Sequence, residues 1–374
     1  MLKAYRGAFL DSNILDPMVQ GTPAVPLAVA PLAPQSAAVD AAPVAAARPP
    51  FLRVVSTSPK AEERPVAAVA EAELPGDFSA LRQLFDQLRA DGRQAAEKGD
   101  LERAFELVDR SVEVARRMDD PEALALATCN RGAVAIMMGR FEELADLRAV
   151  LVRNWSVETS FIAAYNLSHA YELRKEFKKA LFYAQVARDR AEGASRSDYL
   201  ANSLNQIGNC LLGDSYFQQA ADEYQRALCL MPAQTSLVST ASTTNRSYCM
   251  LVMGRKREPF GQLFRSLRWL RRRGLHLYET WPHLFLCYGY LELGRLRRAY
   301  IHGKKALAIA ERTGEYDAKK NALFLLAEVE KAAGETGAAY ELLVSMQREF
   351  YPNDSHLAEL MSVVEMKQLV NLRA

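Results

Sequence analysis

The chain has 374 residues, of which 49% are hydrophobic and 25% charged, with a formal net charge of +2. This composition excludes a chain that is disordered throughout, and the net charge by itself indicates no class of partner. We expect no membrane span and no signal peptide, because no apolar run is long enough. Five dispersed cysteines without a CxxC pair predict buried, reduced thiols and a cytoplasmic protein.

Residues 1–75 are expected to form a disordered arm. Ala, Pro and Val dominate from Gly21 to Pro75 without helical or strand periodicity. Repeated prolines prevent a continuous helix, and few side chains are large enough to offset the entropy of ordering. The arm is either inert or carries a short recognition segment within residues 1–18. Candidate anchors of such a segment are Tyr5, Phe9, Leu10, Ile14 and Leu15.

The helical pattern begins near Asp77, a candidate N-cap, and its clearest unit is Asn202–Pro232. Residues at three- and four-residue spacing predict two facing helices, and Gly213-Asp214-Ser215 predicts the turn between them. The packing residues are Leu204, Ile207, Gly208, Leu211, Phe217, Ala220, Tyr224, Ala227 and Leu228. Their pattern and the terminal proline resemble a tetratricopeptide repeat.

The same unit recurs along the chain, with turns separated by 40, 36, 40, 39, 40 and 40 residues. The turn residues are Gly99, Gly139, Lys175, Ser215, Gly254, Gly294 and Gly334. A small residue stands seven positions before each turn, at Gly92, Gly132, Ser168, Gly208, Ser247, Cys287 and Ala327. Alanine stands five positions after five of the seven turns. Such a period predicts an α-solenoid.

We therefore expect an all-α protein in which residues 76–352 form a right-handed solenoid of about seven antiparallel helix pairs. Residues 353–374 should add a capping helix, from about Ser355 to Arg373, that covers the exposed end. The fifth unit departs most from the pattern, with Lys256 after the turn and Pro259 at the alanine position. The 40-residue period is similar to that of repeat domains in bacterial peptide-sensing regulators and maltose-type transcription activators.

Catalytic motifs are missing from the sequence. It contains no HExxH, GxxxxGK[ST] or GxSxG and no Cys/His cluster at zinc spacing, and its five histidines are scattered. We therefore expect a protein that is not an enzyme and that uses no metal and no cofactor.

A row of side-chain amides is the first candidate binding surface. The resemblance implies that the first helix of each unit lines a concave groove, and an amide can both donate to and accept from a peptide backbone. Nine positions before four consecutive turns stand Asn130, Asn166, Gln206 and Asn245, with His169, Asn202, Asn205, Asn209 and Arg246 nearby. Alternatively, these residues solvate the groove or cap neighbouring helices.

The resemblance to tetratricopeptide repeats suggests one specific ligand, because some members of that family clamp a C-terminal carboxylate with lysine and asparagine side chains. Asn209 and Asn245 match two asparagines of that clamp, but Asn205 stands where a lysine belongs. Trp281 and Phe285 occupy the later basic positions, so a carboxylate is not the expected ligand. These two aromatic residues are core residues or, alternatively, a pocket for a partner's side chain.

The second candidate surface is basic, with 14 Lys/Arg against 3 Asp/Glu between Arg246 and Lys305. Its candidate residues are Arg255, Lys256, Arg257, Arg265, Arg268, Arg271, Arg272, Arg273, Arg297 and Arg298. One interpretation is a solvated face, and in a homodimer this face could lie against the acidic half of a second copy. An acidic protein partner is another, and nucleic acid is disfavoured because no binding module is recognisable.

The expected function is a non-catalytic scaffold or adaptor, in the manner of a bacterial regulator, that holds an extended peptide or protein segment in its groove. The rival is a regulator that binds an acidic partner or nucleic acid through the basic patch. A third possibility is a sensor that works beside a separate output domain.

Overall fold

A computed structural model describes residues 76–231, 236–364 and 371–373; the predicted arm at residues 1–75 lies outside them. Within these described ranges the chain is helical and contains no strand. The first eight helices are α1 (Phe78–Lys98), α2 (Leu101–Met118), α3 (Pro121–Met137), α4 (Leu144–Arg153), α5 (Val157–Leu173), α6 (Phe177–Gly193), α7 (Ser197–Gly213) and α8 (Phe217–Leu230). The others are α9 (Leu237–Val252), α10 (Glu258–Arg272), the 3-10 helix η1 (His276–Glu279), α11 (Thr280–Glu292), α12 (Leu296–Thr313), α13 (Tyr316–Ala333), α14 (Thr336–Phe350) and α15 (Leu357–Val363).

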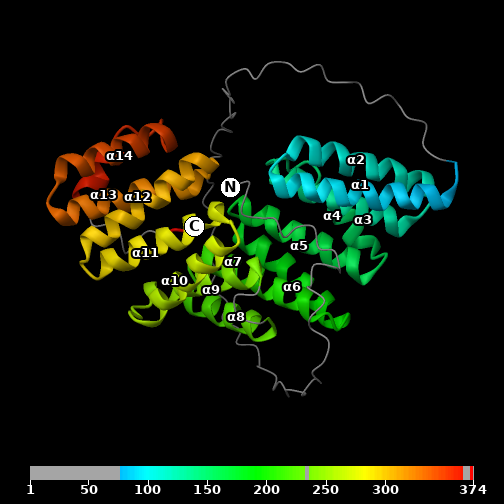
Figure 1. The fold of residues 1–374 in the computed structure, drawn as a ribbon, viewed down its shortest axis with the longest axis horizontal. Helices are drawn as coiled ribbons and strands as arrows, with labels where there is room; N and C mark the ends of the chain where they lie inside the picture. The colour runs from blue at the N-terminus through cyan, green and yellow to red at the C-terminus, as the bar shows by residue number, and fades with distance from the viewer. Residues whose placement is uncertain (1–75, 232–235, 365–370, 374) are drawn as a thin grey trace, which may run out of the picture. The chain divides into compact units, whose positions relative to one another are not determined.

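Consecutive helices pack as seven antiparallel pairs, from α1/α2 to α13/α14 (Figure 1). The first helix of each pair also contacts the first helix of the next pair along the whole series. Each pair therefore buries its apolar stripe against both neighbours, which confirms the predicted α-solenoid. None of the helices in the described part of the chain has the length and apolar character that crossing a membrane requires.

The solenoid begins with a helix whose N-terminus is capped by a side chain. Helix α1 begins after Asp77, whose side chain accepts a hydrogen bond from the backbone N–H of Ala80 at 3.1 Å. This contact satisfies one of the amide groups that a helix start leaves unpaired, so the predicted N-cap is confirmed.

All seven predicted turn residues adopt a positive φ, between 61° at Lys175 and 85° at Gly334. A side chain beyond Cα is strained in this left-handed region, which explains why five of the seven are glycine. Each helix pair needs one residue of this conformation to reverse the chain, and this is why the turn residues recur at a regular spacing in the sequence.

The turn conformation can be tested at Gly139, where a methyl group would meet no other atom within 4 Å. Gly139→Ala is expected to lower the free energy of unfolding by about 1–2 kcal/mol, purely through backbone strain at φ 75°. The matched control is Gly337→Ala in α14, where space is equally open and φ is not positive. Alanine there should raise stability by up to about 1 kcal/mol. If both variants lost the same free energy of unfolding in urea, backbone strain at Gly139 would not be the cause.

The predicted small residues lie where the two helices of a pair cross. A methyl group on Gly92 would lie 2.9 Å from Val108, on Gly132 2.8 Å from Leu147, and on Gly208 2.7 Å from Tyr224. The residues five positions after the turns are all buried: Ala104, Leu144, Ala180, Ala220, Pro259, Ala299 and Ala339. The sequence landmarks of the repeat are therefore sites of close packing between helices.

The capping helix is shorter than predicted. Helix α15 ends at Val363, because Val364 takes an extended conformation with ψ 135°, and Asn371–Arg373 is not helical. The short helix still covers the end of the solenoid, since Lys331 of α13 donates to the backbone carbonyls of Met361 and Val364 at 2.8 Å. The prediction that Ser355–Arg373 forms one helix is therefore wrong in extent.

A second prediction is corrected by the packing of α8. Four cysteines are buried as expected, but Cys229 is exposed. It stands two residues after Ala227, which is fully buried, and this spacing turns it toward the opposite face of the helix. The other four thiols are enclosed by the core, and burial raises the pKa of Cys129 to about 12.

Candidate peptide-binding face

The predicted amides lie on the first helices of successive units, α3, α5, α7 and α9; the surface formed by the first helices is called the first-helix face below. Asn202 is half-buried and Arg246 is partly exposed. The other candidates are buried, with 8% or less of each residue exposed: Asn130, Asn166, His169, Asn205, Gln206, Asn209 and Asn245. Burial lowers the pKa of His169 to about 4, so this imidazole is neutral at pH 7.

Three of the predicted amides form one hydrogen-bonded chain across α5, α7 and α9. Gln206 donates from Nε2 to Glu172 Oε2 at 2.8 Å, and Asn209 donates to Gln206 Oε1 at 3.4 Å. Asn209 Oδ1 in turn accepts from Asn245 Nδ2 at 3.1 Å and from the hydroxyl of Tyr224 at 2.8 Å. These bonds fix the orientation of the amides, because a buried polar group must keep its partners.

Further amides join neighbouring units, as the alternative interpretation predicts. Asn166 donates to the backbone carbonyl of Cys129 at 3.1 Å, and Asn205 Oδ1 accepts from Ser242 Oγ at 2.7 Å. Arg246 instead pairs with Glu258 of α10 at 3.3 Å. Alanine at Asn166 would therefore remove a bond within the fold, and such a variant does not separate binding from packing.

Asn130 differs from these amides. Its Nδ2 group is buried and has no hydrogen-bond partner among the described residues. A buried donor without a partner costs free energy, so a carbonyl group of a ligand would be stabilised beside Asn130 Nδ2.

A short non-helical segment, Asn371–Arg373, lies against the first-helix face. The backbone N–H of Leu372 donates to the hydroxyl of Tyr248 in α9 at 3.0 Å, and its carbonyl accepts from Asn321 Nδ2 of α13 at 2.6 Å. Asn371 donates from Nδ2 to the carbonyl of Leu212 at 2.6 Å, at the end of α7. Side chains of this face thus bind both backbone groups of a non-helical residue.

The side chains of the segment are held as well. Leu372 is 1% exposed and belongs to the same apolar core as the repeats. The guanidinium of Arg373 lies 4.3 Å from the ring centroid of Trp281 and 3.6 Å from Glu172 Oε1. The face therefore offers an apolar site followed by a site for a cation, made of one aromatic ring and one carboxylate.

From the sequence, Trp281 and Phe285 could be core residues or a pocket for a partner's side chain. In the structure one of them lies in the core and the other lines the first-helix face. Phe285 is fully buried and stacks on Tyr248 with ring centroids 4.4 Å apart. Trp281, one turn earlier on α11, is only partly buried and faces Arg373. Helix periodicity alone cannot separate two aromatic residues four positions apart, because both fall on one side of the helix.

Glu172, Tyr248 and Asn321 were missed by sequence reasoning. A signal for two of them exists: Asn321 stands thirteen positions before its turn, as Trp281 and Asn202 do. Tyr248 stands six before its turn, as Asn209 does. Comparing these positions between units, in addition to the amide row, would have found them.

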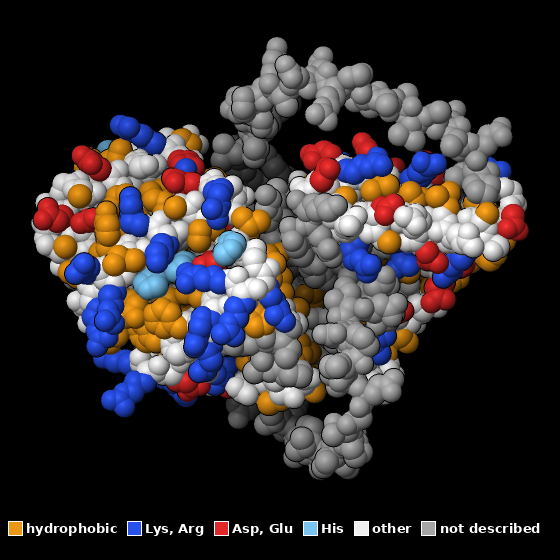
Figure 2. Space-filling view, in the orientation of Figure 1, with side chains coloured by type: hydrophobic (Ala, Val, Ile, Leu, Met, Phe, Trp, Pro, Cys, Tyr) orange, Lys and Arg blue, Asp and Glu red, His pale blue; other side chains and the backbone are white. Residues whose placement is uncertain are grey.

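The basic patch lies on α10 and α12, on the turn before α10 and on Arg273 directly after α10, and all ten predicted residues are exposed. Figure 2 shows Lys and Arg side chains gathered around a group of histidines on the left of the view, where Figure 1 places α10, α11 and α12. Arg271 pairs with Glu279 at 2.9 Å, Arg273 lies over the Trp269 ring at 4.4 Å, and Arg298 lies over the Tyr290 ring at 5.6 Å. The patch and the first-helix face are thus built from different side chains.

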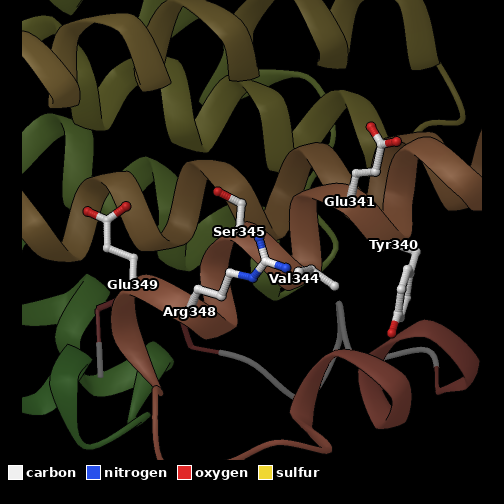
Figure 3. Close-up of a pocket in the computed structure, with 6 residues that line it drawn as sticks. All are labelled: Tyr340, Glu341, Val344, Ser345, Arg348 and Glu349. Atoms are coloured by element: carbon white, nitrogen blue, oxygen red, sulfur yellow. The ribbon is translucent and has the colours of Figure 1, made fainter.

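The surface has two other hollows. One of about 600 Å³ is lined by residues of α14 alone, with Glu341 and Glu349 at opposite ends (Figure 3). A second of about 570 Å³ lies between α10, η1 and α12 and includes His276, Glu279 and His283. The described residues contain no group of three or more His, Cys, Asp or Glu that could hold a metal ion. In the second hollow, Arg271 and His276 each lie 2.9 Å from Glu279, so its polar groups are paired with one another.

No family model matches this chain, and no curated protein matches it. Among solved structures it is similar to the apo form of RapI, at 13% identity and TM-score 0.54, over 78% of this chain and 82% of that one. It is also similar to a Rap protein complexed with Competence and Sporulation Factor, at 13% identity and TM-score 0.54, over 78% and 79%. A signal-transduction ATPase from Pyrococcus horikoshii with a tetratricopeptide repeat sensor matches at 13% identity and TM-score 0.51, over 76% and 46%.

Proposed function

We propose that this chain, whose repeats have the tetratricopeptide-repeat fold, is a non-catalytic regulatory scaffold that binds an extended peptide segment on its first-helix face. The observation that carries this proposal is the capture of Leu372, whose N–H and carbonyl are bound by Tyr248 and Asn321. Bonds to the backbone accept many sequences, whereas pockets for side chains select among them.

Physical features of the face support a peptide rather than a small molecule. Its binding groups come from α5, α9, α11 and α13, so they are spread over four units in the manner of a surface for an extended chain. Glu172 and the amides are already oriented by bonds among themselves, which lowers the entropic cost of binding. A similar fold occurs in a Rap protein complexed with Competence and Sporulation Factor.

The test uses peptides of random sequence displayed on phage and selected on the full chain. In chains that also carry Arg373→Ala, which loosens the chain's own segment, enriched peptides should bind at least about tenfold more weakly after Trp281→Ala or Asn321→Ala. Each of these variants removes a group that contacts Arg373 or Leu372 in the structure. Tyr340→Ala, on the exposed side of α14, is the control and should bind like the wild type. Affinities are measured by fluorescence anisotropy. Selected peptides that bind both variants unchanged would refute the proposal.

A further inference from the structure

The segment Asn371–Arg373 resembles a bound ligand more than a part of the solenoid. It follows the last helix of the series and adds no helix to it. Its contacts reach residues between 51 and 159 positions away in the chain, at Asn321, Tyr248 and Leu212. The solenoid packs through neighbouring units, so contacts to several distant units at once are typical of a ligand that lies across them.

Three subsites can be read from these contacts. The first accepts an amide side chain, because Asn371 Nδ2 donates to Leu212 O at 2.6 Å and lies 3.0 Å from Ser215 Oγ. The second encloses an aliphatic side chain, Leu372, while binding both of its backbone groups. The third, between Trp281 and Glu172, accepts a cation.

The cation subsite is the most selective of the three. Glu172 is 8% exposed, so its carboxylate needs compensation, which Gln206 and Arg373 supply at 2.8 Å and 3.6 Å. A planar guanidinium can stack on Trp281 while it approaches the carboxylate, which an acidic or apolar residue cannot do.

Resting on the proposed function, we infer that Asn371–Arg373 is a ligand in cis that occupies the peptide-binding face, and that the partner carries a similar segment of amide, aliphatic and basic residues. Because the segment belongs to the same chain as the face, its binding is intramolecular, and a free peptide must displace it. Binding of the partner is therefore regulated by release of this segment.

The experiment uses a fluorescein-labelled synthetic peptide with the sequence of residues 365–374, EMKQLVNLRA, added to the full chain. A full chain with Asn371→Gly, Leu372→Gly and Arg373→Gly should bind it at least about tenfold more tightly than the wild type, since its face is no longer occupied. Arg373→Ala alone should also bind the peptide more tightly than the wild type. This single variant replaces the triple variant if the latter does not fold. Arg348→Ala, at an exposed position of α14, should behave as the wild type.

Two altered peptides test the subsites in the triple-variant chain. Glutamate in place of the peptide's arginine and aspartate in place of the leucine before it should each weaken binding by at least about tenfold. Equal affinities for the wild-type and triple-variant chains would overturn the inference. If random peptides selected on the chain bind while EMKQLVNLRA does not, the inference fails and the proposed function stands. If neither binds the triple variant, both fail.

Discussion

The free energy of unfolding is expected to fall as the pH drops from about 6.5 toward 4, because the buried His283 and its partly buried neighbour His302 are neutral in the folded chain. Burial lowers the pKa of His283 to about 3, with His302, Arg271 and Lys305 acting in the same direction. Burial also lowers the pKa of His302 to about 4, helped by Lys305 and Arg271.

The hydrogen bonds of the pair explain the neutral state. Arg271 can only donate, so His283 Nε2, at 3.3 Å, accepts, and the ring carries its proton on Nδ1. That Nδ1–H donates to His302 Nδ1 at 2.8 Å. The carboxylate of Glu279 lies 3.6 Å from His283, and it is shared with Arg271 and His276. The surroundings of His283 therefore favour its neutral form.

The folded and unfolded chains bind different numbers of protons below pH 6.5. Below pH 6.5 the unfolded chain binds protons that folded His283 does not, so stability is complete above that pH and is lost as the pH falls toward the folded pKa. The slope for His283 is up to about 1.4 kcal/mol per pH unit. His302 is partly exposed and contributes less.

Urea unfolding between pH 7 and pH 4.5 measures this slope. His283→Gln keeps polar atoms at the site but does not titrate, so its stability should depend less on pH than that of the wild type. The control is His356→Gln, because the His356 side chain is 83% exposed, and it should leave the slope unchanged. Parallel pH profiles for the wild type and His283→Gln would contradict the prediction.

Gly208→Ala is expected to lower the free energy of unfolding by about 1–3 kcal/mol. The new methyl group would lie 2.7 Å from Cε1 of Tyr224, closer than carbon atoms can approach without a shift. Tyr224 is fully buried and its hydroxyl is bonded to Asn209, so the ring cannot move without disturbing the amide chain. The loss should exceed the gain of up to about 1 kcal/mol that alanine brings to a helix.

The matched control for this variant is Gly193→Ala near the end of α6. A methyl group at that position would meet no atom within 4 Å, so alanine should leave stability unchanged or raise it slightly. Chemical unfolding followed by circular dichroism compares the two. A Gly208→Ala chain as stable as the Gly193→Ala chain would show that the helix crossing is not close-packed.

Local sequence determined the fold of this protein almost completely. Turn residues such as Gly139 and close crossings such as Gly208 recur at a fixed period, because every pair solves the same two packing problems with its own residues. Helix ends were harder to predict. Val364 carries no breaker signal, yet the chain turns extended there, so the capping helix is shorter than its apolar pattern suggests.

The candidate site was decided by tertiary structure. The sequence indicated the helices on which the site lies. It could not show which amides would form hydrogen bonds between helices, as Asn166 does, because that bond joins residues 37 positions apart. Nor could it place Arg373 between Trp281 and Glu172, which come together only when several units are stacked. Local spacing dictates a repeat, whereas a site assembled from different repeats depends on how they pack.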